Sequence, residues 1–291
     1  MNTHTNTMNL YEVSPAEYHR KLTCHRENIF SPDSWLSKSL LWELNASSLY
    51  KWRFHSRPHA VTAAMQWGTL IDCLTTTPEL AETELAISEF ESFRTKSAQE
   101  WRDQNLADGK IIVTPDQLAG GRQAARMLTH TCVRSARIFS HSRSQVVIAG
   151  RIMGCNVKGL VDLAPVGEDF LVDLKTTSSF SIDGFARQTA AFGYHVQAGL
   201  YLHLWNAMFP SDQRTRFKFI WQDAGSPYEV AVTELHRDEI ERGYEYALYQ
   251  LQRLTDAARA DHWPMAFDAR EPLIMRPPWA AMQEEERREA A

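Results

Sequence analysis

Asp162, Asp173 and Lys175 are the residues of this chain whose types and spacing could carry chemistry. Apolar runs on either side of Gly167 and Glu168 predict two β-strands, and a glycine at that position is typical of a two-residue hairpin turn. This register places Asp162 directly opposite Asp173, and Lys175 shares the face of Asp173 because side chains alternate along a strand. Two facing carboxylates repel each other, so the pattern indicates a site for a hard divalent cation with an amine beside it.

Such a site would suit the hydrolysis of a phosphodiester bond. Mg²⁺ prefers one or two carboxylates together with water and phosphate oxygens, and it lowers the pKa of a bound water. Lys175 would hold the attacking water, and the backbone carbonyl of Leu174 is a further candidate ligand. The alternative is an ordinary hairpin whose carboxylates are neutralised by Lys158 and Lys175 in a surface salt-bridge cluster, since D-x-K is a short pattern.

A longer and more specific pattern surrounds these residues. It consists of K-G-L-V-D at residues 158–162, D-L-K-T-T at 173–177 and Q-A-G-L-Y at 197–201. In this order and spacing the three segments resemble the PD-(D/E)XK nuclease superfamily, and in particular the branch of RecB-type nucleases and exonuclease VIII (RecE-type) phage exonucleases. The resemblance implies an α/β fold with a restriction-endonuclease-like core, a small mixed sheet flanked by helices, and an N-terminal helical extension.

The resemblance also implies roles for individual residues. The two aspartates would bind the metal, and the lysine would organise the attacking water. Gln197 and Tyr201 stand at i and i+4 of a helix and would face the substrate strand, although Tyr201 alone would equally suit an apolar core. Thr176 and Thr177 would contact phosphate, because this region borders the substrate path in the family.

An upstream segment supports the same branch and departs from it at one position. Residues 68–79 resemble the family helix G-x-x-x-H-x-L-x-x-x-P-E, with Asp72 where the family carries its metal-binding histidine. Gln145 stands where the family often has a glutamate. Asp72 remains a candidate ligand because hard cations prefer oxygen donors. These two departures leave the number of metal ions open.

The function implied by the resemblance is a Mg²⁺-dependent DNA exonuclease, with Mn²⁺ as a substitute ion. It would digest one strand of linear double-stranded DNA from the 5′ end and leave a 3′ overhang for a phage single-strand annealing protein. Relatives form rings around DNA, which implies a homo-oligomer. Two alternatives stay open, namely an endonuclease of the same chemistry and a nuclease-fold protein that binds DNA or protein without cutting, which the Asp72 and Gln145 departures motivate.

The charge balance requires that any DNA contact be local. The 291 residues include 31 Lys and Arg against 36 Asp and Glu, a formal net charge of −5. Arg122 and Arg126 are one turn apart on a predicted helix, in a stretch with no acidic residue between Asp116 and Asp162. We therefore expect these two arginines, followed by Arg134, Arg137 and Arg143, to form the wall of a phosphate-binding groove.

The remaining patterns predict one nuclease domain in the cytoplasm. We divide residues 1–291 into an N-terminal extension (1–30), a helical part (31–109), the nuclease core (110–260) and a C-terminal tail (261–291). Helices are expected through residues 35–44, 79–93 and 237–260. Four cysteines without a C-x-x-C pair indicate free thiols, and the sequence shows neither a signal peptide nor a membrane-spanning run. The expected location is the cytoplasm of a bacterial host carrying the phage or prophage.

Overall fold

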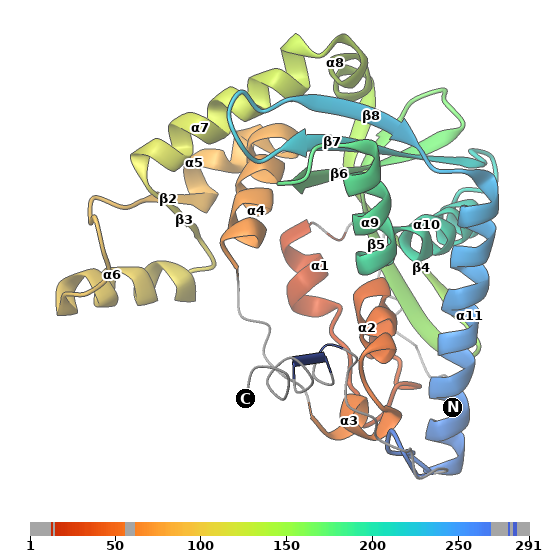
Figure 1. The fold of residues 1–291 in the computed structure, drawn as a ribbon. Coiled ribbons are helices and arrows are strands. Elements are labelled where there is room, and N and C mark those ends of the chain that lie inside the picture. The colour runs from red at the N-terminus through yellow and green to blue at the C-terminus, as the bar shows by residue number, and fades with distance from the viewer. Residues whose placement is uncertain (1–12, 14, 56–61, 269–278, 280–281, 284–291) are drawn as a thin grey trace, which may run out of the picture.

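A six-stranded mixed sheet forms the centre of the molecule (Figure 1). The computed structural model describes residues 13, 15–55, 62–268, 279 and 282–283. The strand order is β1-β5-β6-β7-β8, with β4 also pairing β5; β1 and β7 run parallel to their partners β5 and β6, and the other pairs are antiparallel. The strands are β1 (Trp35–Ser37), β4 (Ser142–Ile152), β5 (Cys155–Pro165), β6 (Phe170–Thr177), β7 (Arg216–Asp223) and β8 (Val230–Glu234).

Helices cover both faces of this sheet, and each face has its own apolar cluster. The larger cluster joins the sheet to α2 (Lys38–Trp42), α9 (Ile182–Phe192), α10 (Tyr194–Met208) and α11 (Arg237–Ala260). The smaller cluster joins it to α4 (Ala63–Thr76), α7 (Pro115–Arg126) and α8 (Val133–Ser140). This layered arrangement is the one expected of a sheet whose strands bury both faces.

Helix α10 is the most deeply buried helix of the core, and glycines allow it to approach α11 closely. A Cβ at Gly199 would lie 2.5 Å from the backbone oxygen of Ile240, and a Cβ at Gly243 would lie within 2.4 Å of the backbone of His195. No larger side chain fits at this crossing, so the two helices pack backbone to backbone. The crossing fixes the helix that carries Gln197 and Tyr201.

A small arm extends from the core and differs from the expected helical layout (Figure 1). Residues 79–93 do not form one helix. They contain the end of a 3₁₀ turn, the short α5 (Ala81–Glu84) and the strand β2 (Leu85–Ile87), which pairs in parallel with β3 (Ile111–Val113). Because β2 and β3 lie on opposite sides of residue 109, the division between helical part and core does not separate structural units. Helix α6 (Lys96–Ala107) connects the two strands.

The expected helix through residues 35–44 is shorter than predicted. Trp35–Ser37 forms a strand that pairs in parallel with residues 156–158, and the helix begins only at Lys38. Ser37 caps it by accepting a hydrogen bond from the backbone N–H of Leu40. The other short elements are α1 (Pro15–Lys21), α3 (Leu49–Phe54), 3₁₀ turns at Glu43–Asn45 and Pro78–Leu80, and a π-helical turn at Met127–Thr131.

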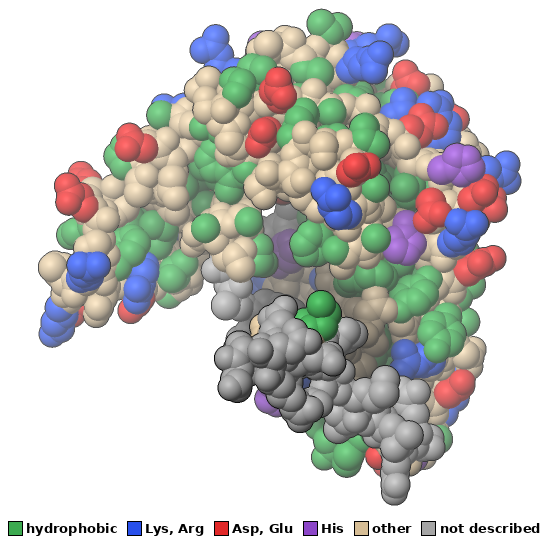
Figure 2. All heavy atoms as spheres, viewed as in Figure 1, with side chains coloured by type: hydrophobic (Ala, Val, Ile, Leu, Met, Phe, Trp, Pro, Cys, Tyr) green, Lys and Arg blue, Asp and Glu red, His purple; other side chains and the backbone are tan. Residues whose placement is uncertain are grey.

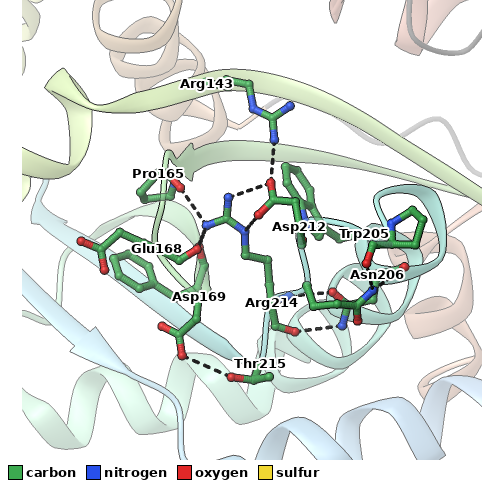
Figure 3. A network of polar contacts seen from close by, with 12 residues as sticks. Arg143, Pro165, Glu168, Asp169, Trp205, Asn206, Asp212, Arg214 and Thr215 are labelled. Carbon is green, nitrogen blue, oxygen red and sulfur yellow. Dashed lines mark hydrogen bonds and ion pairs between the residues drawn. The ribbon is translucent and has the colours of Figure 1, made fainter.

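Arg214 anchors the hairpin of β5 and β6 at its turn (Figure 3). Its side chain is 1% exposed and donates hydrogen bonds to the carbonyls of Pro165, Glu168 and Phe170. An ion pair with Asp212 at 2.9 Å balances its charge. The turn therefore has a buried cation holding its backbone. In the part of the chain that the structure describes, no helix has the length and apolarity needed to cross a membrane.

Candidate active site

The predicted register of the central hairpin is confirmed. Leu163 pairs with Val172, which corresponds to a turn at Gly167 and Glu168, and Gly167 has the positive φ of 77° that such a turn requires. Next to this pair, a side chain contacts the neighbouring strand. The carboxylate of Asp162 accepts a hydrogen bond from the backbone N–H of Leu174 at 2.8 Å. The register continued from Leu163 and Val172 places Asp162 opposite Asp173, and at this point a side chain of β5 bonds to the backbone of β6.

Lys175, Asp173 and Gln197 form a contiguous polar cluster on the α10 side of the sheet. The ammonium group of Lys175 forms an ion pair with Asp173 and lies 3.4 Å from the Oε1 of Gln197. The Nε2 of Gln197 in turn donates to the other oxygen of Asp173. Asp173 is only 3% exposed, so all three groups interact in a poorly solvated environment. The structure brings these predicted residues together.

Asp72 joins this cluster electrostatically from helix α4. Burial, and next the charge of Asp173, raises the pKa of Asp72 from 3.8 to about 7. Burial and the charges of Asp173 and Asp72 likewise raise the pKa of Asp162 well above its ordinary range. Burial opposes the charge of Lys175, but the carboxylates, led by Asp173, raise its pKa above the ordinary value. The cluster therefore has more carboxyl groups than its one ammonium group can keep ionised, and Asp72 and Asp162 take up protons more readily than usual.

Three carboxyl groups beside one ammonium group fit a divalent cation, whose charge would favour their ionised form. Asp162 and Asp173 supply hard oxygen donors from adjacent strands, and Mg²⁺ needs only one or two carboxylates beside water and substrate oxygens. Within the described ranges, no three His, Cys, Asp or Glu side chains are close enough to hold an ion jointly. Asp72 as a third ligand and the carbonyl of Leu174 as a fourth therefore remain predictions.

Gln145 occupies the position across from Asp162, where the β4–β5 ladder is interrupted. The flanking pairs are Ser144 with Leu163 and Val146 with Val161, and Gln145 has a positive φ of 50°. Its amide donates to the hydroxyl of Thr76 at 3.1 Å. Gln145 therefore links β4 to the end of α4.

Tyr201 and the two threonines are more enclosed than direct substrate contacts would suggest. Tyr201 is 9% exposed and its ring lies against Gly159, where an added Cβ would be 2.7 Å from the ring. Thr177 is 3% exposed, and its hydroxyl already accepts hydrogen bonds from Ser179 and Gln188. Thr176 is half-buried and faces Gly68 of α4. Contact of these residues with DNA stays a prediction.

A cavity of about 650 Å³ opens beside Lys175, and its far wall was not foreseen from the sequence. Lys38 of α2 lines it, is 8% exposed, and donates to the backbone oxygen of Phe192. Tyr194 also lines it and carries the Nζ of Lys175 at 4.3 Å from its ring centroid. Tyr194 stands three residues before Gln197 on the same helix, so helical spacing from the Q-x-x-x-Y motif would have found it.

Lys158 takes no part in the carboxylate cluster. Its ammonium group donates to the backbone oxygen of Tyr18 at 3.0 Å and lies 3.8 Å from the centroid of that ring. Burial lowers its pKa to about 8. The alternative in which Lys158 and Lys175 together neutralise the two aspartates is therefore wrong for Lys158, which supports the N-terminal helix instead.

The predicted basic wall is only partly free to bind phosphate. Arg122 and Arg126 lie exposed on α7, whose Ala124 packs into the smaller apolar cluster. Arg143 instead forms an ion pair with Asp212 at 3.1 Å and joins the network around the hairpin turn (Figure 3). On the face shown in Figure 2, basic and acidic side chains are interspersed. The structure does not bring the α7 arginines into the carboxylate cluster.

Comparisons with known proteins agree with this geometry. Residues 45–271 match the family described as PDDEXK-like domain of unknown function (DUF3799). A crystal structure from Eubacterium rectale, named "Putative exonuclease", is similar at a TM-score of 0.55 and 12% identity, over 97% of this chain and 98% of that chain. A structure named SSO0001 reaches a TM-score of only 0.31 at 13% identity, over 78% and 87% of the two chains, and supports no argument. No match was found among curated proteins.

The predicted fold and superfamily are confirmed by these findings together. The mixed sheet with helices on both faces is the expected architecture, and the family match includes the hairpin, α4 and α10. With most of its length inside that match, the chain belongs to the family of PDDEXK-like domains of unknown function.

Proposed function

We propose that this protein is a divalent-metal-dependent exonuclease that hydrolyses linear double-stranded DNA. The observation that carries the proposal is the cluster of Asp162, Asp173, Lys175 and Gln197, which combines hard oxygen donors with an ammonium group on one face of the sheet. The nuclease-like fold supports the same chemistry. Digestion from the 5′ end, leaving 3′ overhangs, is the polarity that the sequence resemblance favours.

Asp162 and Asp173 would hold the metal ion, with Asp72 close enough to contribute charge. When bound, Mg²⁺ supplies a Lewis acid for the phosphoryl group and a more acidic water. Lys175 orients the attacking water and offsets negative charge that grows on the phosphate. Gln197 contacts both Lys175 and Asp173, so it holds the ammonium group and the carboxylate in a fixed relation.

The proposal also covers the process in which the enzyme acts and its oligomeric state. A 3′ overhang is the substrate of a single-strand annealing protein, so we place the enzyme in phage- or prophage-directed recombination in the bacterial cytoplasm. A homo-oligomeric ring around the DNA would make digestion processive. These features rest on the resemblance of the nuclease motifs.

The deciding experiment is digestion of end-labelled linear duplex in Mg²⁺ by the wild type and by Lys175→Ala. We expect the wild type to release the 5′ label first. The variant should be at least a hundredfold slower, because it lacks the ammonium group that offsets negative charge growing on the phosphate. Lys218→Ala is the matched control, since that lysine is similarly buried at 20% side-chain exposure but pairs with Glu234 instead. Closed circular DNA separates exonuclease from endonuclease activity.

The outcome that contradicts the proposal is equally clear. Cleavage by Lys175→Ala at the wild-type rate would exclude the mechanism. Tight binding of DNA without cleavage in either Mg²⁺ or Mn²⁺ would instead favour a binding protein with a nuclease fold.

A further inference from the structure

The ring of Tyr194 is a direct neighbour of the catalytic ammonium group. The Nζ of Lys175 lies 4.3 Å from the ring centroid, well inside the roughly 6 Å within which an aromatic face attracts a cation. Tyr194 is held in place by the core, with its ring centroid 5.8 Å from that of Phe219 and 6.0 Å from that of Trp221. A rigid ring therefore stands beside a flexible lysine.

Three groups contact the Lys175 ammonium, and a bound metal would not affect these contacts equally. Asp173 forms the ion pair, the Oε1 of Gln197 lies at 3.4 Å, and Tyr194 offers its ring. Asp173 is also a proposed metal ligand, so a divalent ion competes with Lys175 for the same carboxylate. Gln197 is itself bonded to Asp173 through its Nε2, so Tyr194 is the one of these three contacts that does not depend on that carboxylate.

Residues of α2 hold the end of α9 and the turn directly before Tyr194. Lys38 and Trp42 donate to the backbone oxygens of Phe192 and Ala191, and a Cβ at Gly193 would lie 2.5 Å from the Trp42 ring. The Nζ of Lys38 is itself 5.4 Å from the centroid of Tyr194. The ring thus lies against two lysines that line one cavity.

We propose that Tyr194 is a positioning residue, whose ring holds the Lys175 ammonium group in its working position while Asp173 binds the metal. The inference rests on the proposed nuclease function. The phenolic hydroxyl has no part in it, because the attraction is to the face of the ring. Phenylalanine should therefore replace tyrosine without loss, whereas an aliphatic side chain of similar bulk should not.

Single-turnover cleavage of linear duplex by Tyr194→Phe and Tyr194→Leu tests this role. We expect the Phe variant to stay within twofold of the wild type and the Leu variant to fall about tenfold to thirtyfold, with the Kd for DNA in metal-free buffer unchanged in both. Tyr249→Leu, which removes a 56% exposed ring elsewhere, is the control. A Leu variant as fast as the wild type, or a Phe variant as slow as the Leu variant, overturns the proposal.

A second measurement separates this proposal from the nuclease function itself. Reductive methylation of lysines with ¹³C-formaldehyde gives each lysine an NMR signal, and Lys175→Arg identifies the signal of Lys175. An upfield ring-current shift is expected in the wild type and in Tyr194→Phe, and its loss in Tyr194→Leu. An unshifted wild-type signal overturns the contact even if the Leu variant does not fold. A shifted signal in a protein whose unmethylated form cleaves no DNA refutes the nuclease function and leaves the contact standing.

Discussion

At the scale of residues, the site is an excess of carboxylates around one ammonium group. Asp162 and Asp72 both have raised carboxyl pKa values, first because they are buried and then because other carboxylates are close. A protein does not gain stability from such an arrangement. It persists where a bound cation, or a substrate approached through one, relieves the repulsion.

Asp72→Asn should show how much the buried carboxylate of Asp72 destabilises the metal-free protein. The carboxyl pKa of Asp72 is about 7 in the folded protein against an ordinary 3.8. The folded state therefore binds this proton more tightly than the unfolded state does. The stability that results is fully present below about pH 4 and is lost as the pH rises through 7. We expect the Asn variant to be more stable than the wild type at pH 8 by roughly 1–2 kcal/mol, and no more stable at pH 4. Thermal unfolding at the two pH values measures this.

Mg²⁺ provides the complementary comparison for Asp72. The ion should raise the unfolding temperature of the wild type at pH 8 more than that of Asp72→Asn, because it binds the ionised carboxylate. Asp103→Asn, at an exposed position in α6, serves as the control. Equal pH dependence in the wild type and Asp72→Asn would show that Asp72 is not the strained group.

Gly159 supports the site from beneath Tyr201. A Cβ added there would lie 2.7 Å from the tyrosine ring and 3.0 Å from the side chain of Ile148. We expect Gly159→Ala to lower the free energy of unfolding by about 1–3 kcal/mol through overpacking, as measured by urea denaturation. Gly68→Ala is the matched control, since its Cβ would meet only Thr176 at an ordinary 3.7 Å. A loss of similar size in both variants would contradict this account.

At the scale of elements, the central hairpin followed from the sequence because local rules determine it. Turn chemistry at Gly167 and the alternation of side chains fixed the register that the Leu163–Val172 pair confirms. Trp35–Ser37 was expected in a helix because its apolar spacing suits one, yet it pairs with β5 more than a hundred residues away. Such long-range pairing overrides local propensity and leaves no mark in the neighbouring sequence.

The same difference between local and long-range contacts separates the site residues that the sequence predicted from those that it did not. Asp162, Asp173, Lys175 and Gln197 were found because their motifs are contiguous and their spacing is regular. Lys38 was missed because its approach to the α9–α10 turn spans about half the chain, as its bond to Phe192 shows. The hydroxyl of Thr177 was expected to meet phosphate, but tertiary contacts with α9 already satisfy it.

Arg214 makes the hairpin depend on a residue that precedes β7. Its guanidinium is buried, bonds three carbonyls of the β5–β6 turn and pairs with Asp212. We expect Arg214→Met to cost about 3–5 kcal/mol of unfolding free energy, because it leaves these buried carbonyls without a donor. Calorimetric unfolding provides the measurement.

Arg216 offers a contrast on the next strand. Its side chain is 42% exposed and pairs with Glu234 and Asp169 at the surface. Arg216→Met should therefore cost only about 0–1 kcal/mol. If the two substitutions were equally harmful, burial would not be the reason for the importance of Arg214.

At the scale of the whole molecule, the proposed binding of DNA would have to overcome a formal net charge of −5. Arg122 and Arg126 are exposed on α7, and each phosphate they neutralise would release condensed counterions. If both touch DNA, the double Ala variant should reduce the slope of log K against log salt concentration by about 2. Fluorescence anisotropy at several salt concentrations gives the slope.

The control for this measurement is the pair Arg237 and Arg242 on α11. These arginines are similarly exposed but form ion pairs with Glu241 and Glu239. Their replacement should leave the slope unchanged. An unaltered slope for the α7 variant as well would place that helix away from the path of the DNA.

The cluster draws Asp72 from the helix layer on one side of the sheet and Gln197 from the layer on the other. These two residues are 125 positions apart, and the hairpin lies between them in the chain. During synthesis on the ribosome, the nascent polypeptide consequently lacks a complete centre until α10 has emerged and docked.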